Sequence, residues 1–159
     1  MVALIGQLLS VHGAEKGAKS NVNIIERLFK KLDYVTKFSH RHFVAQRRDA
    51  PQSVLALFSL DGDPDVRDRI AGNPSTPKSV LIRLASDMRW SVRYRLADNP
   101  STPKFVLTKL SKDANADVRH TVAMNLNTPK TILKKLSNDQ DIGVSLQALH
   151  TLKELTDWR

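Results

Sequence analysis

The chain has 159 residues, which is enough for one domain of ordinary size with a buried core. Lysine and arginine number 25 against 16 aspartate and glutamate residues, and the resulting net charge of +9 favours nucleic acid or acidic protein surfaces as partners. No cysteine is present, which excludes disulfides, thiolate metal sites, iron–sulfur clusters and cysteine nucleophiles.

The first 38 residues are predicted to form a helical N-terminal cap. Residues 1–11 are apolar, but no lysine or arginine precedes them, and they are far fewer than the roughly 20 residues needed to span a bilayer. We therefore expect an amphipathic packing helix in a cytoplasmic protein. A polar loop at residues 13–20 separates it from a second apolar helix at residues 24–32.

A repeat of 26 residues organises the rest of the chain, and Pro51, Pro77, Pro103 and Pro129 mark its four copies. Apolar residues follow each proline at the third, fourth and seventh positions, which is the stripe of a short helix. Each copy then has an Asp and, five residues later, a Val. Arg follows this Val in three copies and Ser145 in the fourth. The predicted copies are residues 51–76, 77–102, 103–128 and 129–150, with a degenerate half-repeat at 39–50 and a C-terminal cap at 151–159.

Each copy is predicted to be a helical hairpin. The first helix is expected to span about nine or ten residues and the second about two turns. Proline suits the start of the first helix, and Thr76, Thr102 and Thr128 precede it as candidate N-caps. The second helix must end before Pro100, and Asn99 suits its exit. A single hairpin cannot bury its apolar face, so the copies are expected to stack into an all-α solenoid.

The phrase Asn73-Pro74-Ser75-Thr76-Pro77, repeated 26 residues later, resembles the variant leucine-rich repeat of bacterial proteins over roughly residues 40–150. The order Asp, five residues, Val-Arg is also similar to the HEAT repeat. The resemblance implies a right-handed α-solenoid and allows 3₁₀ geometry in the second helix. A member of the variant family holds an iron–sulfur centre on a cysteine cluster, but this chain lacks cysteine, so no cofactor is expected. The fourth copy lacks the Asn-Pro pair before its Thr128-Pro129, and we expect its stacking toward the cap to differ.

The repeated acids and arginines are interpreted as structural, because catalytic carboxylates are not expected four times over. Each Asp can cap a helix or pair with an arginine of its own or of a neighbouring copy. The acids are Asp61, Asp87, Asp113 and Asp139, and the arginines are Arg67, Arg93 and Arg119.

Stacking would also align basic residues of the first helices into exposed rows. These residues are Lys78, Lys104, Lys130, Arg83, Lys109 and Lys135. They are either a solvated surface or a contact surface for a partner.

The face formed by the second helices carries the candidate site, because basic and aromatic residues are interleaved on it. The candidate residues are Arg47, Arg48, Arg69, Arg89, Trp90, Arg93, Tyr94, Arg95 and His120. The alternative is that Trp90 and Tyr94 are packing residues at a repeat junction. Acidic residues gather in the first full copy, and a nucleic-acid track would have to skirt them.

The sequence favours a binding module that is not an enzyme. It shows no phosphate loop or nucleophile motif, and the segment His40-Arg41-His42 has no usual metal-ligand spacing. We expect no catalytic residue, no metal and no small-molecule substrate. The leading hypothesis is nucleic-acid binding through phosphate contacts. The alternative is an adaptor that binds a peptide or an acidic protein.

Overall fold

The computed structural model of the chain describes residues 38–157. The chain divides into two compact units, Met1–Arg41 and His42–Arg159, each with most of its residue contacts inside the unit. The second unit contains the four predicted copies. The N-terminal cap predicted at residues 1–38 lies almost entirely outside the described residues. The prediction of one domain over residues 1–159 stays a prediction.

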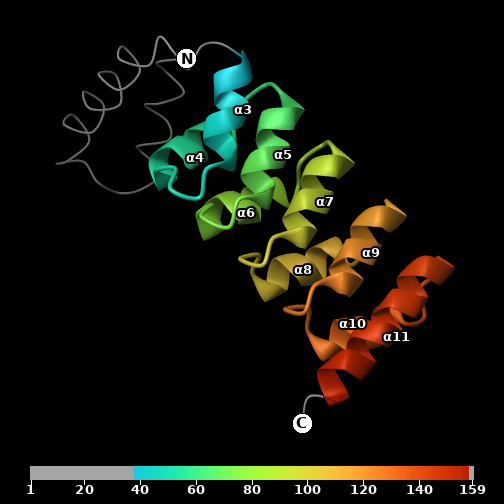
Figure 1. Cartoon of the computed structure of the whole chain (residues 1–159). Coiled ribbons are helices and arrows are strands. Elements are labelled where there is room, and N and C mark those ends of the chain that lie inside the picture. Colours follow the sequence, from blue (N-terminus) through green and yellow to red (C-terminus); the bar gives the residue numbers. More distant parts are fainter. Residues whose placement is uncertain (1–37, 158–159) are drawn as a thin grey trace. The chain divides into compact units, whose positions relative to one another are not determined.

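Residues 38–157 form helices joined by short loops, and no strand occurs among them. In Figure 1, α4, α6, α8 and α10 follow one another along one side of the second unit, and α5, α7, α9 and α11 follow one another along the other. This part of the chain is therefore all-α, as predicted. The helices are α3 (Phe38–Gln46), α4 (Gln52–Phe58), α5 (Pro64–Gly72), α6 (Lys78–Leu84), α7 (Trp90–Asp98), α8 (Lys104–Leu110), α9 (Ala116–Met124), α10 (Lys130–Leu136) and α11 (Ile142–Asp157).

The core lies where the helix pairs meet. Each first helix packs against the second helix of its own copy, and α5 packs on α7, α7 on α9 and α9 on α11. The leucine at the fourth position after each proline is fully buried, as is the valine of each second helix. This burial confirms the apolar positions predicted from the repeat. These residues are Leu55, Leu81, Leu107, Leu133, Val66, Val92, Val118 and Val144.

The predicted helix lengths within a copy are wrong. The first helices α4, α6, α8 and α10 have 7 residues, and the second helices α5, α7 and α9 have 9. All of them are α-helices. The first helix ends early because the Ser86 and Asp87 amides donate to carbonyls three residues back, which makes a tight turn. The second helix α7 begins at Trp90, two residues before its buried Val92. It begins this early because the Asp87 carboxylate accepts a hydrogen bond from the Arg89 amide and so fixes the backbone where the helix starts.

The prediction that threonines cap the first helices is also wrong. The N-cap residues are the prolines themselves, without a side-chain cap bond. Each threonine hydroxyl instead donates to a carbonyl six residues earlier, in the preceding second helix, as Thr102 does to Leu96 at 2.6 Å. A threonine before proline is held in extended geometry, and here its hydroxyl satisfies a carbonyl of the helix that has just ended.

An asparagine at the end of α5, α7 and α9 links adjacent copies by hydrogen bonds. The Asn99 side chain is 1% exposed, and its amide donates to the Ala71 and Asn73 carbonyls of the previous copy at 2.7 and 2.9 Å. Its oxygen accepts the Ser101 amide at 2.8 Å. Asn73 makes the same set of bonds one copy earlier, to the carbonyls of Ala45 and Arg47. The exit role predicted for Asn99 is confirmed, and its link between copies is an additional finding.

The third and fourth copies keep part of this arrangement. Asn125 takes the place of Asn99, and its amide donates to the Ala97 carbonyl at 2.7 Å. Ser145 stands where the earlier copies have arginine, and its hydroxyl donates to the Ser137 carbonyl at 3.1 Å. Helix α11 runs on to Asp157, beyond the length of the earlier second helices and into the segment predicted as the C-terminal cap. Leu149, equivalent to the buried Ala123, is exposed.

Candidate functional site

The repeated arginines and acids link neighbouring copies. Arg93 donates from Nε and Nη2 to the two carboxylate oxygens of Asp113 at 2.6 and 2.9 Å. From Nη1 it also donates to the Asp87 carbonyl of its own copy at 2.7 Å. The same geometry recurs in the pairs Arg67 with Asp87 and Arg119 with Asp139. Of the alternatives predicted for these residues, pairing with a neighbouring copy is observed, and Asp87, Asp113 and Asp139 each also accept the backbone amide two residues later, at the entry of the second helix.

The arginines lower the pKa of all three carboxyl groups. At Asp139 the Arg119 hydrogen bond is the largest cause. At Asp87 and Asp113 burial acts to raise the pKa, but arginine hydrogen bonds, a backbone amide and arginine charges together outweigh it, so the pKa is lowered there too. The charged form of each acid is therefore the form that the fold stabilises.

These shifts predict a loss of stability in acid. The unfolded carboxyl groups, with a pKa of about 3.9, bind protons before the folded ones as the pH falls. We therefore expect the free energy of unfolding to be unaffected by these groups above about pH 5 and to decrease as the pH falls below about 4. Urea unfolding at several pH values measures this. Asp113→Asn should show a shallower decrease, and a wild-type stability that stays constant from pH 6 to pH 3 would contradict the interpretation.

The structure separates several of the predicted site residues. Arg93 belongs to the link between copies, where Asp113 and the backbone occupy its guanidinium group. Arg69 donates to Nδ1 of His42 at 3.0 Å, and Arg47 pairs with Asp49. Arg48 and Arg89 are exposed and do not line the groove described next. The predicted set is therefore not one continuous surface of available cations.

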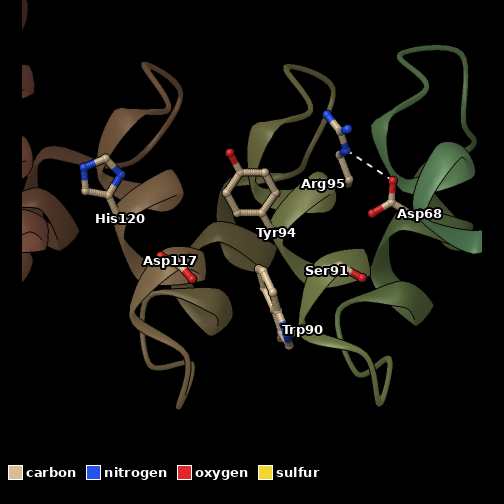
Figure 2. Close-up of a pocket in the computed structure, with 7 residues that line it drawn as sticks. All are labelled: Asp68, Trp90, Ser91, Tyr94, Arg95, Asp117 and His120. Atoms are coloured by element: carbon tan, nitrogen blue, oxygen red, sulfur yellow. Dashed lines mark hydrogen bonds and ion pairs between the residues drawn. The ribbon is translucent and has the colours of Figure 1, made fainter. Parts of the chain in front are cut away.

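Four of the predicted residues do come together, in an open groove of about 530 Å³. Figure 2 shows Trp90 and Tyr94 of α7 at its centre, with Asp117 and His120 of α9 on one side and Asp68 of α5 on the other. The Trp90 and Tyr94 rings are nearly perpendicular, at 84°, with centroids 6.3 Å apart. Trp90 remains 47% exposed, so much of its surface is open to a ligand. The lining residues are Asp68, Trp90, Ser91, Tyr94, Arg95, Asp117 and His120.

The side chains that line the groove carry a small net negative charge. Its one guanidinium group, Arg95, donates to Asp68 at 3.2 Å. Burial raises the pKa of Asp68, and the Arg95 charge opposes that shift. Asp117 is exposed, and its carboxylate has no hydrogen-bond partner among residues 38–157. The groove thus holds two carboxylates against one arginine that is already paired.

Sequence reasoning missed Asp68, Ser91 and Asp117 as groove residues. The signal that could have found them is the repeat itself, because residues 26 positions apart occupy equivalent places on neighbouring second helices. Asp68, Tyr94 and His120 form one such series, and Ser91 and Asp117 belong to another. A comparison of the copies at these variable positions would have identified most of the residues that line the groove.

The basic residues of the first helices form a different kind of surface. Helices α6, α8 and α10 contain 7 lysine and arginine residues and no acid. All seven are exposed, and Lys109 and Arg83 also reach serines of the previous copy. Phe105 of α8 is 60% exposed among them. The predicted exposure of these cations is confirmed, and their alignment into rows stays a prediction.

Comparisons with protein-family models, with curated proteins and with solved structures gave no significant match. The class of the protein therefore rests on its own architecture, an all-α chain with repeat-like helix pairs over the described residues. Among residues 38–157, no helix combines the length and apolar character needed to cross a membrane.

Proposed function

We propose that the protein is a non-enzymatic α-solenoid that binds nucleic acid through phosphate contacts made by its first helices. The solenoid is supported by the recurrence of the same hydrogen bonds in successive copies and by the packing of each second helix on the next. The likeness to variant leucine-rich and HEAT repeats, with a right-handed twist, is part of this proposal. So is the location in the cytoplasm.

A single observation carries the functional proposal: α6, α8 and α10 present 7 exposed cations without one acid. The nearby acids of the turns, such as Asp87 and Asp113, are bound by arginines and have their charge compensated. Exposed cations without nearby acids can neutralise phosphates, and this binding releases the counterions held by the nucleic-acid backbone. The second helices do not offer this, because their charges are mixed.

Phe105 adds a second type of contact to this surface. It lies one helical turn before Lys109, so the two side chains share one face of α8. An exposed aromatic ring among cations can stack on a base of single-stranded nucleic acid. We therefore expect single-stranded DNA or RNA to bind with little dependence on its sequence.

The test is a gel-shift series against salt with two charge-matched variants. The first carries Lys104→Gln, Lys109→Gln and Lys130→Gln. We expect it to bind more weakly than wild type and to lower the slope of log K against log salt by about 0.7 for each phosphate that the variant no longer neutralises. The second carries Arg48→Gln, Arg89→Gln and Arg95→Gln, and we expect it to behave nearly as wild type.

Both variants lower the net charge from +9 to +6, so the comparison isolates the position of the charge. Equal weakening by the two variants would show that net charge, not the first helices, attracts the nucleic acid. Failure of the wild-type protein to retard any oligonucleotide at about 50 mM salt, where phosphate contacts are strong, would refute the proposal.

A further inference from the structure

The groove on α5, α7 and α9 has the wrong charge for the ligand of the first helices. A nucleic acid entering it would bring phosphates close to Asp68 and Asp117, and the only guanidinium group in the lining is engaged by Asp68. Repulsion between like charges opposes such binding. A different ligand is therefore required to explain a groove with this lining.

The lining matches a cation. Trp90 and Tyr94 present two nearly perpendicular rings, and the negative faces of aromatic rings attract ammonium and guanidinium groups. Asp117 supplies a carboxylate without a protein partner among residues 38–157, beside these rings. A cation in this position would gain a charge-assisted hydrogen bond as well as contact with the rings.

The size and openness of the groove favour, as its ligand, a single side chain of a peptide. The groove is about 530 Å³ and is open to solvent, so a peptide chain can lie outside while one side chain enters. We propose that this groove binds a peptide segment through an arginine or lysine side chain, which lies against Trp90 and Tyr94 and pairs with Asp117. The site is separate from the nucleic-acid surface of the first helices and does not depend on it.

Asp117 is the residue that separates this proposal from nucleic-acid binding in the groove. Asp117→Asn removes the charge but keeps the size of the side chain. A cationic peptide should then bind about two- to fivefold more weakly, since a solvent-exposed charge pair is removed. An oligonucleotide in the same groove would bind more tightly, because a repulsive charge is gone. The two ligands thus predict changes of opposite sign.

Asp65→Asn is the matched control. Asp65 occupies the position in α5 that Asp117 occupies in α9, in the first turn of the helix, but it does not line the groove. Both substitutions remove one acid near a helix N-terminus, so they change helix stability and net charge alike. Only Asp117→Asn should weaken the peptide.

The experiment titrates the full chain, carrying Trp158→Phe so that Trp90 alone reports, with a Gly-Ser nonapeptide that contains three arginines. Tryptophan fluorescence is followed at about 0.15 M salt, where screening limits repulsion by the basic surface. The same peptide with lysine tests the other cation, and the peptide with uncharged citrulline tests the need for charge. We expect saturable binding of the arginine or lysine peptide, none of the citrulline peptide, and weakening by Asp117→Asn but not by Asp65→Asn.

Several results would overturn the inference. They are equal binding of the citrulline peptide, equal effects of the two Asp→Asn substitutions, or no change in Trp90 fluorescence with either cationic peptide up to about 5 mM, the weak end of specific affinities. Tighter oligonucleotide binding by Asp117→Asn would assign the groove to nucleic acid instead. A failed gel shift would leave the peptide site unaffected, because the two experiments use different ligands and different surfaces.

Discussion

Asn99→Asp is expected to destabilise the protein by about 3 to 5 kcal/mol at pH 7, the range found when a buried charge is left without a partner. The Asn99 amide group donates to two carbonyl oxygens of the previous copy in a site that is 1% exposed. The substitution replaces this donor by a second carboxylate oxygen, which would face two acceptors. Urea unfolding at pH 7, followed by circular dichroism, measures the loss.

Asn99→Ala separates the effect of charge from the loss of the donor. It leaves the Ala71 and Asn73 carbonyls without the amide group but adds no charge, and we expect a smaller cost of about 1 to 3 kcal/mol. Burial raises the pKa of a carboxyl group, and a protonated carboxyl can donate one hydrogen bond. The deficit of Asn99→Asp relative to wild type should therefore shrink as the pH falls toward 4. A deficit below that of Asn99→Ala at pH 7 would show that the link between copies does not depend on this amide.

Arg93→Ala is expected to cost about 2 to 4 kcal/mol, somewhat less than removal of one partner from a fully buried pair. The Arg93 and Asp113 side chains are 18% and 7% exposed, and the guanidinium group binds both carboxylate oxygens and a carbonyl of its own copy. Its removal would leave Asp113 largely desolvated without its counter-ion. Chemical unfolding of the variant and of the wild type gives the difference.

Arg95→Ala is the matched control for Arg93→Ala. The two arginines lie two residues apart in α7, and both pair with an Asp of a neighbouring copy. Arg95 is 53% exposed, however, so solvent screens its pair with Asp68 and we expect a loss of at most about 1 kcal/mol. Equal losses from the two substitutions would show that the depth of the pair is not what makes the Arg93 link stabilising. A double-mutant cycle with Asp113→Ala would then measure the coupling directly.

Much of the fold could be predicted from the sequence because the same physical requirements recur every 26 residues. The apolar spacing from Val80 through Leu84 places one helix face in the core, and Val92 and Leu96 place another, whatever the neighbours are. Helix ends were harder to predict. They depend on hydrogen bonds such as that from Arg89 to Asp87, which a pattern of apolar residues does not contain.

The candidate site was predicted only in part for a related reason. Trp90, Tyr94 and His120 differ from the residues at the equivalent positions of the other copies, and the structure brings them to one groove together with Arg95. Arg93 stands beside them in the sequence but belongs to the repeat, and its side chain turns to the next copy. Adjacent positions on a helix face different directions, so proximity in sequence did not separate groove residues from linking residues.

The helical class, the repeat length, the core positions and the surplus of positive charge follow from the amino-acid sequence alone. Which cations remain available depends on how the helices pack. Arginines of the second helices are largely engaged by acids of neighbouring copies, whereas the lysines of α6, α8 and α10 have no acid on their own helices. The physical reason is that charge counts add along the chain, but pairing depends on which side chains the stacking of copies brings within hydrogen-bond distance.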